Sequence, residues 1–282
     1  MPMPHGAQDL PLVSSVDFLN ADDGWLVLQA PHGMGSSPGV LFRTSDGGAT
    51  WHAVSRTPIM NVAREAPPTL PVAGQVEFRS PEDGWLVGGQ VATGPHALYA
   101  TKNGGATWHL MALPTYPPGA LSDSVAGMPR TRGELLTVSV AYQDSELRTG
   151  IVLFRSSDGG RTWRVGASLF GGDDVALLSP ETALALRLSP FDPLHPNRNV
   201  AASVWRTNDG GASWHLVSDL SRALRRQLAA PLVSLSLTFV DSRTGFVWAT
   251  TEVAGSPQRT FWIDETTDGG RTWASRWPAN AN

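Results

Sequence analysis

The chain of 282 residues contains no cysteine, one lysine and no long run of apolar residues. The absence of cysteine excludes disulfide bonds, thiolate metal ligands and cysteine nucleophiles. Because no stretch reaches about 18 consecutive apolar residues, the sequence predicts no membrane-spanning helix. The net charge of −4 provides no overall basic field, so we expect no nucleic-acid partner.

Residues 1–11 carry neither the basic nor the apolar region of a signal peptide, and we treat them as an N-terminal tail. If a leader has been removed upstream, the expected location is extracytoplasmic: periplasmic, secreted or at the cell surface.

Glycine and tryptophan, by contrast, are abundant, and they follow a repeat. Five segments share the pattern Ser/Thr-x-Asp/Asn-Gly-Gly-x-Ser/Thr-Trp, and successive tryptophans lie 51 to 59 residues apart. We call each segment a box. The boxes are Thr44–Trp51, Thr101–Trp108, Ser156–Trp163, Thr207–Trp214 and Thr266–Trp273. A repeat of roughly 40–60 residues is typical of β-propellers.

Each repeat predicts four short strands, with the box as the hairpin between the third and the fourth. The acidic side chain accepts N–H groups of the turn, and the two glycines permit positive φ. In the first repeat the predicted strands are Ser15–Leu19, Gly24–Gln29, Val40–Thr44 and Thr50–Val54. Apolar residues fill both faces of the third strands, as a sheet between two neighbours requires.

We therefore predict an all-β fold: a five-bladed β-propeller of four-stranded antiparallel blades. One domain spans 12–282, with blades at about 12–55, 72–113, 124–169, 174–220 and 232–277.

The box is similar to the Asp-box, or bacterial neuraminidase repeat, of sialidases, xyloglucanases and sortilin-like receptors. Together with the preceding Asp23-Gly-Trp25-Leu-Val27, it resembles the photosystem II stability/assembly factor family and its bacterial relatives, whose photosynthetic members have seven blades. The resemblance implies a binding or assembly role and a structural, peripheral Asp-box. The structural box residues are then Asp46, Trp51, Asn103, Trp108, Asp158, Trp163, Asp209, Trp214, Asp268 and Trp273. We expect neither a metal nor a cofactor.

Long loops on the face opposite the boxes are the predicted binding region. Candidate binding residues there are Arg64, Tyr116, His195, Arg198, Arg222, Arg225 and Arg226. Three of these arginines belong to a predicted helix over Ser218–Ala230, outside its leucine stripe. They form either an anion- or partner-binding face or simply a solvated helix face.

An acid pair provides an alternative. Asp17 and Glu77 align on the inner strands of adjacent blades and could serve a secreted glycoside hydrolase or polysaccharide lyase as general acid and base. The other interpretation is two solvated groups at the channel edge, which is favoured because both residues lie in mid-strand and not at the end with the long loops. The sequence shows no other catalytic signature. Our main prediction is a non-catalytic binding or assembly scaffold for a protein or glycan, monomeric and without cofactor.

Overall fold

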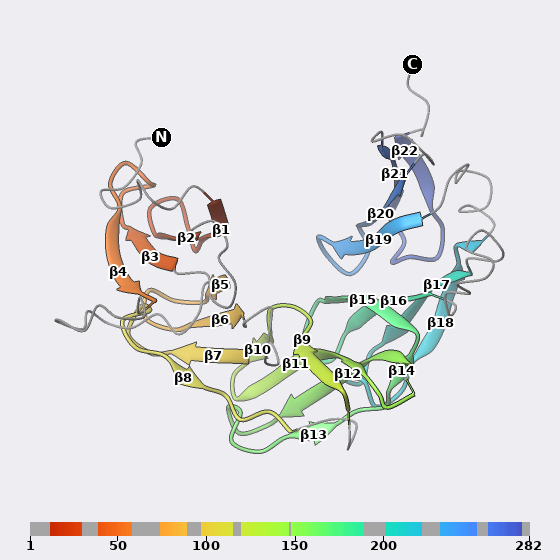
Figure 1. The fold of residues 1–282 in the computed structure, drawn as a ribbon, viewed down its shortest axis with the longest axis horizontal. Helices are drawn as coiled ribbons and strands as arrows, with labels where there is room; N and C mark the ends of the chain where they lie inside the picture. Colours follow the sequence, from red (N-terminus) through yellow and green to blue (C-terminus); the bar gives the residue numbers. More distant parts are fainter. Residues whose placement is uncertain are drawn as a thin grey trace. The chain divides into compact units, whose positions relative to one another are not determined.

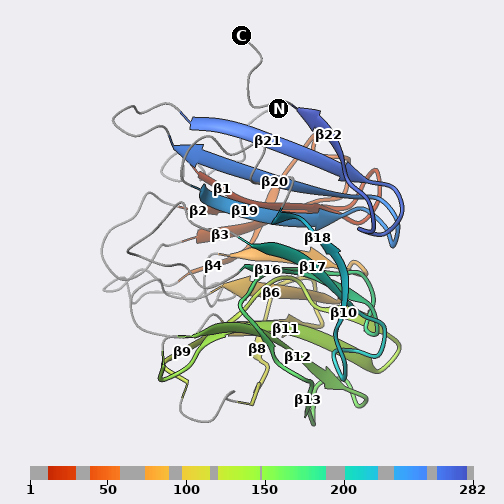
Figure 2. The same cartoon turned by 90° about the vertical axis from the view of Figure 1, so that its right-hand side faces the viewer.

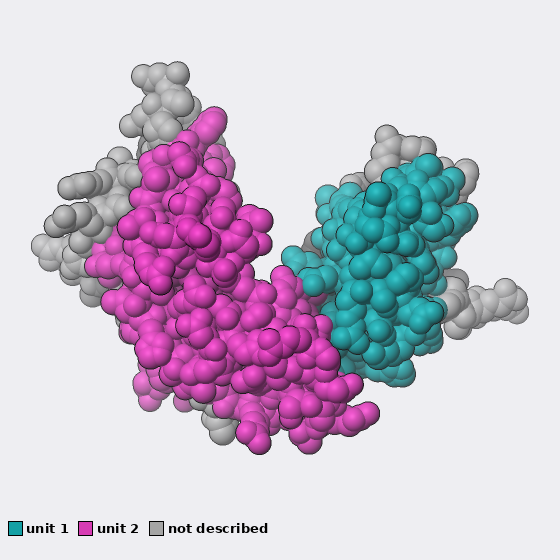
Figure 3. All heavy atoms as spheres, turned by 180° about the vertical axis from the view of Figure 1, so that it is seen from behind, with its two compact units in different colours: residues 1–113 teal, residues 114–282 magenta. Residues whose placement is uncertain are grey.

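The computed structural model describes residues 12–29, 39–57, 74–88, 97–114, 120–146, 148–188, 201–221, 232–252 and 259–277. The fold is all-β, a five-bladed propeller of antiparallel blades, as predicted. The chain divides into two compact units, residues 1–113 with blades one and two and residues 114–282 with blades three to five (Figure 3). Among the described residues, no helix has the length and apolarity needed to span a membrane.

Unit 1 contains two four-stranded sheets whose strands pair in chain order (Figure 1). Blade one consists of β1 (Leu12–Phe18), β2 (Gly24–Gln29), β3 (Gly39–Thr44) and β4 (His52–Arg56). Blade two consists of β5 (Gln75–Phe78), β6 (Gly84–Gly88), β7 (Ala97–Thr101) and β8 (His109–Leu110).

In unit 2, the sheets of blades four and five follow the same plan, and Figure 2 shows the strands of blade five side by side. Blade four consists of β15 (Gly172–Leu177), β16 (Ala183–Leu188), β17 (Ala202–Thr207) and β18 (His215–Asp219). Blade five consists of β19 (Leu232–Phe239), β20 (Gly245–Glu252), β21 (Arg259–Thr266) and β22 (Ala274–Trp277).

Blade three keeps the four-strand plan but splits its first and last strands. Both β9 (Ser122–Val125) and β10 (Arg130–Arg132) pair with β11 (Leu135–Gln143). Both β13 (Arg164–Val165) and β14 (Leu169–Phe170) pair with β12 (Thr149–Ser156). Gly127, at φ 148°, separates the inner pair. The outer strand breaks where the Ala167 N–H donates to the Gly211 carbonyl of blade four instead of to its own sheet.

The central strands of blade one are buried on both faces, whereas those of blade five are buried on the face toward blade four and leave Trp248 and Phe261 exposed on the other. In unit 1, Trp25 stacks on Phe78 of the next blade with ring centroids 3.8 Å apart, and its Nε1 donates to the Gly104 carbonyl. In unit 2, Val204 of blade four packs in one apolar cluster with Trp262 of blade five.

The first strand of blade one is Leu12–Phe18 and not the predicted Ser15–Leu19, and two further predicted boundaries are wrong for identifiable reasons. The fourth strand of blade one begins at His52 rather than Thr50, because the Thr50 N–H and hydroxyl both bind Asp46 in the turn. The helix predicted over Ser218–Ala230 does not begin at Ser218: β18 continues through Asp219, and Leu220 is buried in the apolar core. Residues 222–230 lie outside the described part of the chain.

Candidate functional site

The two ends of each blade differ in how the chain connects. The box, and the turn between the first and second strands, close one end. Segments from the second to the third strand, and from one blade to the next, leave at the opposite end. Residues of these segments such as 30–38, 58–73 and 189–200 lie outside the described residues. The same holds for all the predicted binding residues: Arg64, Tyr116, His195, Arg198, Arg222, Arg225 and Arg226.

At the box end, each acidic side chain is used within its own turn. In blade one, Asp46 Oδ1 accepts hydrogen bonds from the Thr44 hydroxyl (2.7 Å) and the Thr50 N–H (2.8 Å), and Oδ2 accepts the Thr50 hydroxyl (2.6 Å). The Gly48 N–H donates to the Thr44 hydroxyl, and the Trp51 indole donates to the Gly48 carbonyl. Blade two uses Asn103 in the same place, with its Nδ2 donating to the Thr107 hydroxyl.

These hydrogen bonds stabilise the charged carboxylates. The Thr50 hydroxyl is the largest cause that holds the pKa of Asp46 at about 2, and Ser213 and Thr272 do the same for Asp209 and Asp268. Thr162 likewise lowers the pKa of Asp158. Each of the four box carboxylates therefore accepts hydrogen bonds at both of its oxygens within its own turn. No group of three or more acidic or histidine side chains that could hold a metal ion occurs among the described residues.

The predicted acid pair lies on neighbouring inner strands of unit 1. Asp17 pairs with Trp25 across its sheet, and Glu77 pairs with Trp85, which is the same register position. Asp17 is half-buried, and its Oδ2 accepts the Phe78 N–H of the next blade at 2.6 Å. Burial raises the pKa of Asp17, an effect that the Phe78 N–H partly offsets.

Sequence reasoning missed a related residue, Asp174. Its Oδ2 accepts the Leu237 N–H of blade five at 2.9 Å. The same position in blade one is Ser15, whose hydroxyl accepts the Val76 N–H at 3.1 Å. Side-chain oxygens of one inner strand thus bind N–H groups on the free edge of the next. The signal that could have identified Asp174 is its alignment with Ser15, since each lies three residues before the last residue of its first strand, Leu177 and Phe18.

Arginines at one position of the third strand extend toward the next blade. Arg43 Nη2 lies 3.1 Å from Asp23, and Arg155 Nη2 lies 3.8 Å from Glu181 of blade four. Arg155 Nη1 also donates to the carbonyl of Asp209, inside the box of that blade. Arg43 therefore pairs with an acid of its own blade, whereas Arg155 joins blade three to blade four by binding a carboxylate and a turn carbonyl.

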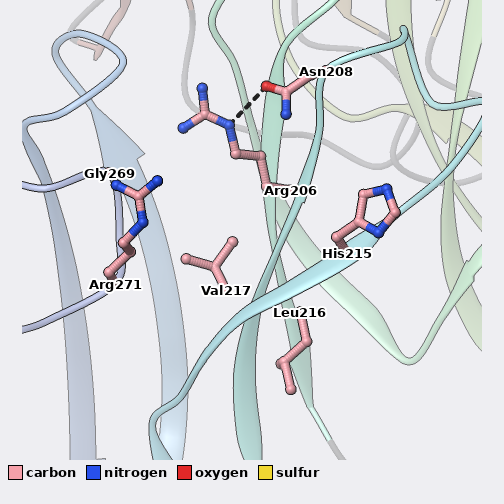
Figure 4. A pocket seen from close by; sticks show the side chains of 7 residues that line it. All are labelled: Arg206, Asn208, His215, Leu216, Val217, Gly269 and Arg271. Atoms are coloured by element: carbon pink, nitrogen blue, oxygen red, sulfur yellow. Dashed lines mark hydrogen bonds between the residues drawn. The ribbon is translucent and has the colours of Figure 1, made fainter.

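Arg206, at the same position in blade four, borders a cavity of about 350 Å³ that sequence reasoning did not identify. We call this cavity the seam pocket. It is lined by Arg206, Asn208, His215, Leu216, Val217, Gly269 and Arg271 (Figure 4). Arg206 and Arg271 approach it from blades four and five, with Val217 between them in Figure 4. Arg206 Nε donates to Asn208 Oδ1 at 2.8 Å, and Arg271 Nη1 donates to the Asp268 carbonyl at 3.0 Å. The seam pocket therefore combines two guanidinium groups with an apolar wall.

Comparisons with known proteins identify structures but no family. No protein-family model matches the chain, and no curated protein matches it. One matching structure is YCF48, a photosystem II assembly factor, bound to D1 peptide, at 18% identity over 95% of this chain and 83% of that chain, with a TM-score of 0.40.

Two further matches have TM-scores above 0.5. A Hadza microbial sialidase shares 17% identity over 92% of this chain and 56% of that chain, with a TM-score of 0.55. The GH74 xyloglucanase from Xanthomonas campestris shares 15% identity over 95% of this chain and 39% of that chain, with a TM-score of 0.53. The chain thus spans little more than half of the sialidase and less than half of the xyloglucanase. The matches thus include a sialidase and a xyloglucanase, two of the kinds of protein whose Asp-box the box resembles. The likeness is one of fold.

Proposed function

We propose that the chain is a non-catalytic binding propeller that takes a protein or a glycan at the end of its blades opposite the boxes. One observation carries the proposal. At the box end, short hydrogen-bonded turns close every blade, whereas β2 and β3 are separated by 30–38, β4 and β5 by 57–74, and β16 and β17 by 189–201. Long connections on a rigid scaffold are where binding function concentrates.

The described acids support a binding role over catalysis. Asp17 and Asp174 both accept backbone N–H groups of the next blade, and the box acids accept hydrogen bonds within their own turns. These uses are structural, because they hold neighbouring strands and turns together.

A retention experiment tests the proposal. Immobilised protein is screened against a glycan array and in a cross-linking pull-down, and the captured partner is then tested on two variants. Shortening the connection between β16 and β17 should abolish capture. Arg161→Gln, an exposed change at the box end, should leave capture intact. If capture survives the shortened connection and is lost in Arg161→Gln, the binding surface lies at the box end and the proposal is wrong.

The alternative is a secreted glycoside hydrolase or polysaccharide lyase that uses Asp17 and Glu77. The raised pKa of Asp17 favours it, since a general acid must hold a proton near working pH. If it is correct, Asp17→Asn and Glu77→Gln should each reduce release of reducing sugar by about 10²-fold or more. Undiminished polysaccharide cleavage in both variants would eliminate this pair as the catalytic residues.

A further inference from the structure

The seam pocket has a charge pattern that the rest of the repeat does not share. In every blade, the first box glycine donates its N–H to a carbonyl in the turn between the first two strands, at 2.8 to 3.0 Å. That carbonyl belongs to an acidic residue in blades one to four and to an arginine in blade five. The five residues are Asp22, Glu82, Glu134, Glu181 and Arg243.

This exchange changes the surroundings of the third-strand arginine in the preceding blade. Arg155 of blade three lies near Glu181, whereas Arg206 of blade four lies near Gly269 of blade five, whose N–H binds the carbonyl of Arg243 at the equivalent position. Arg206 binds only the neutral Asn208 amide, and within the part of the chain that the structure describes no carboxylate pairs with Arg206 or Arg271. Two guanidinium groups therefore line the same cavity without a carboxylate partner among the described residues.

Arg271 adds a second positive charge to the pocket, at a box position that is alanine in most blades. Ala49, Ala106 and Ala212 occupy it in blades one, two and four, and Arg161 occupies it in blade three. The carboxylate of Asp268, the acid nearest to Arg271 in sequence, accepts hydrogen bonds from Thr266, Thr272 and the Arg271 N–H. Both of its oxygens accept hydrogen bonds within the turn.

We propose that the seam pocket binds a small organic oxyanion, a carboxylate or a phosphate ester. Its charged group binds between Arg206 and Arg271, because planar guanidinium groups match carboxylate and phosphate oxygens with paired N–H donors. The uncharged body of the ligand packs on Val217 and Leu216, the latter 57% exposed. A cavity of about 350 Å³ lies within the range of small-molecule sites and exceeds the needs of an inorganic ion. The site is at the box end, so it is independent of the binding end proposed above.

Calorimetric titration of the full chain tests the proposal with four probes: galacturonate, galactose 6-phosphate, galactose and inorganic phosphate. Galacturonate shows carboxylate binding, and galactose 6-phosphate shows phosphate-ester binding. We expect at least one of these two to bind and neutral galactose not to bind. Binding of inorganic phosphate alone would overturn the organic class of the ligand, and binding of none of the probes would overturn the site.

Matched variants distinguish a role in ligand binding at the seam pocket from a structural role that the equivalent positions share in other blades. Arg206→Gln and Arg271→Ala should each weaken binding by about tenfold or more, the loss expected for one charge-assisted hydrogen bond. Their counterparts in blade three, Arg155→Gln and Arg161→Ala, should change the affinity less than about twofold. Equal losses from both sets would show that the effect arises from packing between blades, and the proposal would be wrong.

One variant avoids the removal of any lining residue. Arg243→Glu restores the acid that the other blades carry at this position, which supplies Arg206 with a carboxylate that competes with the ligand. It should weaken binding by about tenfold, whereas Arg161→Glu, with the same change in net charge, should not. Unchanged affinity in Arg243→Glu would contradict the proposed charge pattern.

Discussion

At the scale of single residues, the acidic side chain of each box is a hydrogen-bond acceptor first and a charge second. Asn103 shows this, because its Oδ1 accepts the Thr107 N–H at 2.8 Å in the way Asp46 Oδ1 accepts the Thr50 N–H. The other four boxes retain a carboxylate whose two oxygens both accept hydrogen bonds. An amide can therefore replace the acid in the turn, but it cannot titrate.

The lowered pKa values predict how stability responds to acid. Asp46, Asp209 and Asp268 have pKa values of about 2 in the folded chain, below the ordinary 3.8. The stability they contribute is fully present above about pH 4 and is lost as the pH falls toward 2. We expect the thermal midpoint to fall over that window. In Asp46→Asn the fall should be smaller, and a slope identical to that of the wild type would contradict the assignment.

The pKa of Asp17 is shifted in the opposite direction from the pKa values of the box acids. Burial raises its pKa, so its contribution to stability decreases as the pH rises through 3.8 toward the folded value. Asp17→Ala leaves the Phe78 N–H without its acceptor and should lower the free energy of unfolding by about 1–3 kcal/mol. Asp17→Asn keeps an acceptor oxygen and should lower it less. Urea unfolding at pH 7 measures both, and equal losses would show that the hydrogen bond is not the cause.

At the scale of elements, substitution of two glycines with positive φ distinguishes the cost of backbone strain from the cost of disturbed packing between blades. Gly211, at φ 86°, lies in the box of blade four, and an added Cβ would lie 2.8 Å from Leu153 Cβ of blade three. Gly133, at φ 60°, has nothing within 4 Å of an added Cβ. Gly133→Ala should cost roughly 1–2 kcal/mol from strain alone.

Gly211→Ala adds a steric clash to the same strain. Overpacking of this kind costs about a further 1–3 kcal/mol. The difference between the two variants in urea unfolding measures how closely the box of blade four packs on blade three. Equal destabilisation would indicate that blade three moves away without loss.

The box and the strands around it follow from local chemistry, which is why the sequence predicts them. A Gly-Gly turn between β-branched runs has few alternatives, and the Trp25–Arg43 and Trp85–Ala100 pairings keep the register expected from alignment. The Asp174 bond and the seam pocket depend on which side chain of one blade meets the next. The role of Arg243 becomes visible only when the Gly269 N–H is seen to bind its carbonyl.

At the scale of the whole molecule, each compact unit has an apolar core of its own. Trp25, Leu41 and Phe78 form one in unit 1, and Leu184, Val204 and Trp262 form one in unit 2. Repeat proteins derive their stability from the sum of repeats and nearest-neighbour contacts, so the two units need not unfold together.

Calorimetry of the intact chain should show two unfolding transitions. Trp51, at 8% exposure the one buried box tryptophan among the described residues, belongs to unit 1. Trp51→Ala should destabilise that unit by about 3–5 kcal/mol and shift one transition while the other stays in place. A single transition that moves as a whole would show that the chain unfolds as one cooperative body.

The side-chain oxygens on the inner strands have a consequence for aggregation. The N–H groups of Val76, Phe78 and Leu237 face away from their own sheets and are bound by Ser15, Asp17 and Asp174. Bare N–H groups on a strand edge recruit foreign strands. Because three polar side chains occupy these donors, the adjacent blades do not pair into one continuous sheet. The same N–H groups are then not available to pair with a strand of another chain.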